Sequence, residues 1–107
     1  MKQGKFAHSV FFWLKNPENI VERDVFEKSL FNFINQSVYI KTKHIGIPAN
    51  TDRAVIDSSY TYSLLLTFDD KANHDKYQEE ANHKRFIKEC ADLWEKVVVY
   101  DANAIID

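Results

Sequence analysis

The chain has 107 residues, near the commonest size of one domain, so we expect residues 1–107 to form a single domain. Its formal net charge of −2 provides no basic surface for nucleic acid or an anionic membrane, and no apolar run approaches the roughly 20 residues that cross a bilayer. One cysteine excludes an intrachain disulfide, and no apolar signal region follows the basic start, so the expected location is cytoplasmic.

Aromatic residues are abundant, with eight Phe, five Tyr and two Trp, which favours a ligand cavity or a subunit interface. Many of them lie in residues 6–15, which alternate as a β-strand does. One face of this strand carries Phe6, His8, Val10, Phe12 and Leu14, and the other carries Ala7, Ser9, Phe11 and Trp13. Because both faces bear large apolar groups, we expect a central strand that is covered on both sides.

A helix is predicted from about residue 16 to residue 35. Asn16 is suited to cap it, Pro17 fits the first helical position, and Glu18 favours the positive end of the helix dipole. The apolar stripe of this helix consists of Phe26, Leu30, Phe33 and Ile34.

Two further strands are predicted at residues 37–46 and 60–68, joined by an irregular connection. Lys41 and Lys43 suit an edge strand, where charge discourages pairing with stray chains. In residues 60–68 alternation puts Tyr60, Tyr62, Leu64, Leu66 and Phe68 on one face.

Two helices and a last strand complete the expected elements. The first helix runs from a cap at Asp69 or Asp70 to about Glu80, and the second runs over about residues 82–93. The second carries His83, Phe86, Ile87 and Cys90 on one stripe, and a β-branched strand follows around residues 97–100.

The order strand, helix, strand, strand, helical pair, strand predicts an α+β fold. It is the ferredoxin-like split βαβ arrangement, a four-stranded antiparallel sheet with helices on one face. Because the strands are apolar on both faces, the open face requires a partner. Pairing of two sheets in a two-fold homodimer, a dimeric α/β barrel, would bury it.

Residues 6–15, the strand at 60–68, Tyr77-Gln78 followed by His83-x-x-Phe86, and the block 94–101 together resemble the Dabb family. This is the family of stress-responsive dimeric α/β-barrel domains. The resemblance covers nearly the whole chain and implies a ferredoxin-like protomer that forms a homodimer through its sheets. In the family, the plant founders are described as stress-responsive structural proteins, and one plant member is a polyketide cyclase that needs no cofactor.

The working groups of that cyclase can be transferred by position. Its histidine base falls on His83 and its helical tyrosine on Tyr77, so both are retained. A strand histidine and a first-helix tyrosine of the cyclase fall on Tyr62 and Leu30, which differ. The family's proline before the histidine is Ala81 here.

His83 and Tyr77 are therefore the candidate catalytic residues. Histidine exchanges protons near neutral pH, and a tyrosine hydroxyl can orient the imidazole or donate to a developing oxyanion. The alternative is a buried histidine that bonds to tyrosine or backbone and fixes the helical corner. A ligand pocket beside them is expected to involve His8, Phe26, Leu30, Tyr62 and Phe86, with Tyr60 as a further wall; ordinary core packing explains these residues equally well.

No metal site and no cofactor are expected, because His8, His44, His74 and His83 show no metal-ligand spacing and no nucleotide motif occurs. Cys90 lies on an apolar stripe and is expected to be a small buried hydrophobe. Three hypotheses remain open. They are a homodimer with an apolar small-molecule pocket, a cofactor-independent enzyme (a cyclase, isomerase or monooxygenase) acting on a ketide- or quinone-like substrate with His83 as base, and a purely structural stress-related assembly protein.

Overall fold

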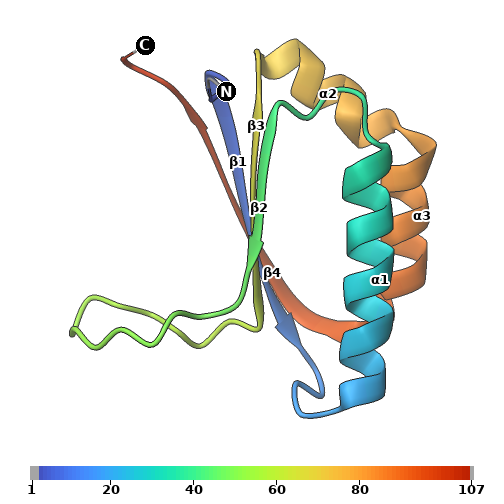
Figure 1. Cartoon of the computed structure of the whole chain (residues 1–107), viewed down its shortest axis with the longest axis vertical. Coiled ribbons are helices and arrows are strands. Elements are labelled where there is room, and N and C mark those ends of the chain that lie inside the picture. Colours follow the sequence, from blue (N-terminus) through green and yellow to red (C-terminus); the bar gives the residue numbers. More distant parts are fainter. Residues whose placement is uncertain (1–2, 107) are drawn as a thin grey trace.

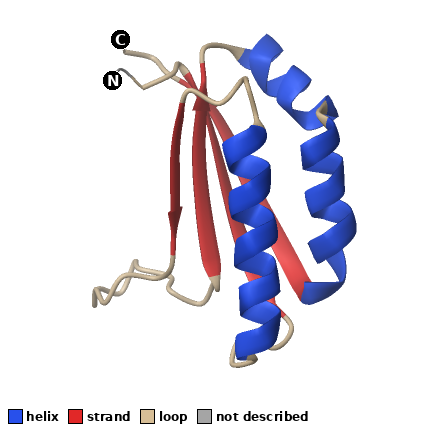
Figure 2. Ribbon diagram, turned by 45° about the vertical axis from the view of Figure 1, so that its right-hand side comes forward, coloured by secondary structure: helices blue, strands red, loops and turns tan. Residues whose placement is uncertain are grey.

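The structure, a computed structural model, describes residues 3–106. Its elements in chain order are β1 (Phe6–Leu14), α1 (Ile20–Gln36), β2 (Thr42–Gly46), β3 (Tyr62–Phe68), α2 (Lys71–Glu79), α3 (Ala81–Cys90), the short 3-10 turn η1 (Ala91–Leu93) and β4 (Trp94–Asn103). The four strands form one antiparallel sheet in the order β2-β3-β1-β4, and the three helices cover one of its faces (Figures 1 and 2). The predicted ferredoxin-like α+β arrangement is confirmed.

Strand β1 is central, as its two apolar faces predict, because it pairs with β3 on one side and β4 on the other. Its residues alternate between buried positions under the helices and half-buried positions on the open face. The register places His8 opposite Leu66 of β3 and Asp101 of β4. One inward-facing polar residue thus has a carboxylate beside it on the neighbouring strand.

The core lies between the sheet and the helices. From α1 it receives the predicted stripe of Phe26, Leu30, Phe33 and Ile34, all of which are buried. The Phe26 ring packs edge-on to the rings of Phe12 and Phe86, so that α1, β1 and α3 meet around one aromatic side chain. Cys90 is fully buried, as expected of a small hydrophobe.

Helix α1 starts later than predicted. Its cap is Asn19, whose side-chain oxygen accepts a hydrogen bond from the Glu22 backbone N–H at 3.1 Å, and Asn16 and Pro17 precede the helix. Asn16 instead donates through its amide to the Glu22 carboxylate. Both asparagines have capping chemistry, and the pairing with Glu22 three residues on selects Asn19.

The two middle strands are shorter than predicted. At the start of residues 37–46, Ser37 and Val38 bond to the Glu80 carboxylate instead of joining the sheet, so β2 begins at Thr42. β3 begins at Tyr62, and the predicted inward orientation of Tyr60 is wrong. The Tyr60 ring packs against Phe11 on the open face, because the alternation of a strand does not extend beyond the β3 ladder.

The β2–β3 connection, residues 47–61, projects from one end of the sheet on the side away from the helices (Figure 1). It is tied back by the Trp13 indole N–H, which donates to the Ser59 hydroxyl at 3.1 Å. None of the helices within residues 3–106 has the length and apolar character needed to cross a membrane.

Candidate functional site

The corner between α2 and α3 places the candidate residues Tyr77 and His83. Glu80 adopts an extended backbone there, and its N–H bonds to the Tyr77 carbonyl. The Glu80 carboxylate accepts hydrogen bonds from the Ser37 hydroxyl and the Val38 N–H, which ties the corner to the end of α1. The corner is therefore fixed without a proline at Ala81 and without a bond to the His83 ring.

A cavity of about 140 Å³ lies between the sheet and this corner. His8, Tyr77 and His83 contribute its polar groups, together with Gln78. The apolar wall comes from five elements: Val10 and Phe12 of β1, Leu64 of β3, Trp94, Val97 and Val99 of β4, Phe33 of α1, and Phe86 and Ile87 of α3. An apolar hollow with a few convergent polar groups is the usual form of a small-ligand site.

Tyr77 and His83 meet edge to face, with ring centroids 5.1 Å apart and an interplanar angle of 74°. Phe33 packs against both rings, at 5.5 Å from Tyr77 and 5.3 Å from His83. Within residues 3–106 neither the Tyr77 hydroxyl nor the His83 imidazole has a hydrogen-bond partner. Both polar groups thus retain unused hydrogen-bonding capacity.

The surroundings hold both groups in their neutral forms. Burial raises the pKa of Tyr77 far above its usual value, and the negative charges of Glu80 and Asp101 add to this effect. Burial also lowers the pKa of His83, as do the nearby imidazoles of His8 and His74, against the opposing charges of Glu80 and Glu79. At neutral pH the pair consists of an uncharged imidazole, able to accept a proton, and a hydroxyl that can donate a hydrogen bond.

The other predicted pocket residues fall into two groups. His8 and Phe86 line the cavity with Tyr77 and His83. Phe26, Leu30 and Tyr62 lie outside its lining and belong to the packed core. The Tyr62 ring stacks on Phe26, and its hydroxyl donates to the Glu27 carboxylate. Burial, and to a lesser extent this hydrogen bond, raises the pKa of Tyr62 to about 12.

A second polar cluster, formed by His8, His74 and Asp101, lies next to the cavity. His8 Nδ1 is 2.6 Å from Asp101 Oδ1 and 3.2 Å from His74 Nε2. The spacing of these residues along the sequence gives no indication that their side chains meet. The inward positions of His8 and Asp101 could be read from strand alternation, but their pairing needs the β1–β4 register, and the approach of His74 needs the docking of α2.

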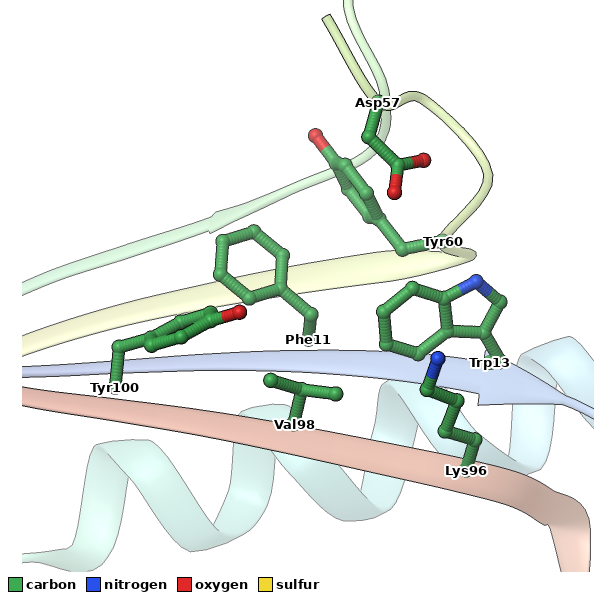
Figure 3. Close-up of a pocket in the computed structure, with 7 residues that line it drawn as sticks. All are labelled: Phe11, Trp13, Asp57, Tyr60, Lys96, Val98 and Tyr100. Carbon is green, nitrogen blue, oxygen red and sulfur yellow. The ribbon is translucent and has the colours of Figure 1, made fainter.

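A separate hollow of about 250 Å³ lies on the open face of the sheet (Figure 3). Its lining residues are Phe11, Trp13, Asp57, Tyr60, Lys96, Val98 and Tyr100. Lys96 lies over the Trp13 ring at 4.6 Å, and Tyr60 and Tyr100 flank Phe11. No histidine lines this hollow. It lies outside the core and opens onto the face of the sheet that the helices leave uncovered.

Comparison with known proteins places this architecture in a family. The model of the Dabb family, described as "Stress responsive A/B Barrel Domain", matches residues 6–104. The chain belongs to the Dabb family. The match includes both strands that carry the polar cluster and both helices that carry Tyr77 and His83. A search of the curated proteins finds no match for this sequence.

Solved structures share the Dabb fold over nearly the full length of the chain. A Dabb family protein with a ferredoxin-like fold from Mesorhizobium loti is 20% identical with a TM-score of 0.78, covering 96% of this chain and 99% of its own. A dimeric ferredoxin-like protein of unknown function from Thermobifida fusca is 14% identical with a TM-score of 0.76, covering 97% and 95%. A hydroxynitrile lyase from Passiflora edulis is 21% identical with a TM-score of 0.76, covering 96% and 95%.

Proposed function

We propose that the protein is a homodimer in which each chain binds a small, largely apolar molecule beside Tyr77 and His83. The observation that carries this proposal is the cavity that reaches both side chains, whose polar atoms have no hydrogen-bond partner within residues 3–106. A histidine that served only to fix the helical corner would bond to the corner. Here Glu80 performs that task.

The size of the cavity limits the ligand. At about 140 Å³ it is close to the roughly 150 Å³ of an engineered protein cavity that binds benzene, and below the 300–1,000 Å³ typical of drug-sized ligands. A ring of about six atoms with one polar substituent fits this volume.

The open face of the sheet supports the proposed dimer. Tyr100 is 64% exposed there and Leu65 is 40% exposed, beside the half-buried rings of Phe11 and Trp13. An aromatic surface of this kind is characteristic of a protein interface, and a second copy offers a matching sheet. The structural neighbour from Thermobifida fusca is described as dimeric. We therefore assign the open face to self-association.

Trp94 lines the cavity and makes ligand binding measurable. In a Trp13→Phe background Trp94 is the only tryptophan, and its fluorescence should change saturably as cyclohexanone, a six-membered ketone, is added. Val97→Phe fills part of the cavity and should abolish the change. The matched substitution Val25→Phe, on an exposed part of α1, should leave it intact.

An unsaturable response, or binding that survives Val97→Phe, would contradict the pocket. In that case assembly of the sheets would remain as the task of the protein, which is the structural alternative.

A second candidate function is cofactor-independent general-base catalysis at this site, favoured by the neutral His83 beside the protonated Tyr77. His83 would remove a proton from the carbon next to a carbonyl, and the electron pair of the broken C–H bond would form an enolate. The Tyr77 hydroxyl would hydrogen-bond to the enolate oxygen, and the imidazolium would return a proton. One solved structure with the same fold is named a hydroxynitrile lyase.

Exchange of the α-protons of cyclohexanone in D₂O, followed by NMR, tests this chemistry. His83→Gln should slow the exchange by about 100-fold or more, and Tyr77→Phe should also slow it by a factor of about 100. His44→Gln, a change at an exposed histidine of β2, is the control. Unchanged exchange in a folded His83→Gln dimer that still binds cyclohexanone would refute catalysis and leave binding standing.

A further inference from the structure

We propose that His8, His74 and Asp101 form a binding site for a divalent transition-metal ion, of which Zn²⁺ is the representative. Each residue offers one ligand atom, and these atoms lie within 4.8 Å of one another. The two histidines are buried and their ring centroids are 4.6 Å apart. Two imidazoles and one carboxylate that converge on one point are a common ligand set for such ions.

The distances between the ligand atoms suit a metal. With Zn–N bonds of about 2.0–2.1 Å, two ligand atoms in tetrahedral geometry are separated by about 3.3–3.4 Å. The 3.2 Å between His8 Nδ1 and His74 Nε2 is already close to this value. Asp101 Oδ1, now 2.6 Å from His8 Nδ1, must withdraw by several tenths of an ångström, and its side chain, 41% exposed, has room to do so.

The hydrogen bonding of the cluster leaves a place for a cation. Both His74 Nε2 and Asp101 Oδ1 approach the same atom, His8 Nδ1. In a neutral imidazole that nitrogen carries either one proton or one lone pair. When His74 carries its proton on Nδ1, a single proton on His8 Nδ1 has to serve both neighbouring atoms. A metal ion would take the place of this proton and accept a lone pair from each of the three.

The neighbouring Asp75 supports the required tautomer of His74. Its carboxylate Oδ1 lies 3.6 Å from His74 Nδ1, on the side of the ring opposite Nε2. A negative charge there favours the proton on Nδ1 and leaves the Nε2 lone pair directed at His8. Carboxylates beside the second nitrogen of a ligating histidine play this part in many metal sites.

The ligands lie on elements that hold them rigidly. His8 and Asp101 are cross-strand neighbours in the β1–β4 ladder. The His74 ring packs on the rings of Phe6 and Phe68, with centroids at 4.6 Å and 5.3 Å, so α2 is fixed on the sheet at this point. A site held by strands and a packed helix is preorganised for its ion.

An ion can reach the site from solvent. His74 and Asp101 line a surface depression of about 410 Å³, which leaves coordination positions open to water. Lys71, which also lines the depression, is engaged by the Asp75 carboxylate at 2.8 Å. The predominance of imidazole favours Zn²⁺, Co²⁺ or Ni²⁺ over Mg²⁺ and Ca²⁺, which prefer oxygen ligands.

The test uses the full chain, metal-free and without a histidine tag, titrated with Zn²⁺ in a calorimeter and with Co²⁺ in an absorption spectrometer. We expect one Zn²⁺ per chain and visible absorption bands from bound Co²⁺. His74→Gln and Asp101→Asn should each weaken Zn²⁺ binding at least about tenfold. The matched substitutions His44→Gln and Asp69→Asn, at exposed positions, should not change it.

Absence of stoichiometric Zn²⁺ binding to the wild-type chain would overturn the proposal, as would unchanged binding in both ligand variants. Asp101→Asn keeps its shape at a half-exposed position, so it decides the question even where His74→Gln does not fold. The cyclohexanone experiments are performed with a chelator present. Metal binding and ligand binding can therefore fail separately.

Discussion

The two faces of the sheet use aromatic side chains in opposite ways. Under the helices, rings such as Phe26 and Phe33 are almost completely buried, and Phe33 lines a cavity that also contains His8, Tyr77 and His83. On the open face, Phe11 and Trp13 are half-buried and Tyr100 is 64% exposed, around a hollow without an enclosed polar centre. The covered face holds a cavity with polar groups, and the open face presents exposed aromatic side chains.

The difference arises within single strands. In β1, His8, Val10 and Phe12 point toward the helices, and Ser9, Phe11 and Trp13 point away. In β4, Val99 and Asp101 share the helix side, and Val98 and Tyr100 lie opposite them. Adjacent residues of one strand therefore lie in different environments, and substitutions at neighbouring positions should have separable effects.

The largest effect is expected for a break in the covered face. Phe26→Ala removes a ring with 0% exposure from its contacts with Phe12, Tyr62 and Phe86, and should lower the free energy of unfolding by about 3–5 kcal/mol. Phe31→Ala on the same helix, where the side chain is 43% exposed, should cost about 1 kcal/mol or less. Urea unfolding measures both. Equal losses would show that the helix-covered layer is not the main source of stability.

A charge on the open face should act on assembly instead of folding. Tyr100→Asp places a carboxylate in the aromatic surface and should raise the dimer dissociation constant at least about 30-fold, the effect of losing an interface hot spot. Sedimentation over a dilution series measures this constant. Ile20→Asp, an exposed position on α1 at the helix side, should leave it unchanged. A Tyr100→Asp protein that remains dimeric at every dilution would exclude the open face as the interface.

The smallest effect concerns proton binding within the covered face. The pKa of His83 is lowered by burial below its ordinary value of 6.5, so the unfolded chain binds this proton more readily than the folded one. The stability associated with neutral His83 is complete above pH 6.5 and falls as the pH falls below it. In His83→Gln this part of the pH dependence should be missing, as measured by thermal melts with a chelator present. If the difference in melting temperature between the wild type and His83→Gln does not vary with pH, the burial of this ring is contradicted.

Much of the fold could be predicted because it depends on local periodicity. The alternation of residues 6–15 gave both faces of β1, and the spacing of Phe26, Leu30 and Phe33 gave the buried stripe of α1. The predicted strand bounds were wrong where a distant side chain forms hydrogen bonds with residues that were expected to join the sheet. The Glu80 carboxylate captures Ser37 and Val38 and shortens β2.

The candidate site was less accessible to sequence reasoning, for a physical reason. Tyr77 and His83 are close along the chain, so one helical corner could bring them together. His8 and His74 are 66 positions apart and His8 and Asp101 are 93 apart, so their meeting depends on strand register and helix docking. Phe26 and Tyr62 could be assigned to the inward side from periodicity. Their position relative to the cavity again depends on strand register and helix docking, which periodicity does not give.

The strict alternation of β1 has a consequence for how this protein can change over time. Insertion or deletion of one residue within the strand would turn every later side chain to the other side of the sheet. His8 would lose its place beside Asp101, and an aromatic ring would leave the open surface in the same event. Point substitutions can therefore alter the two sides of the strand independently, whereas a change in its length alters both at once.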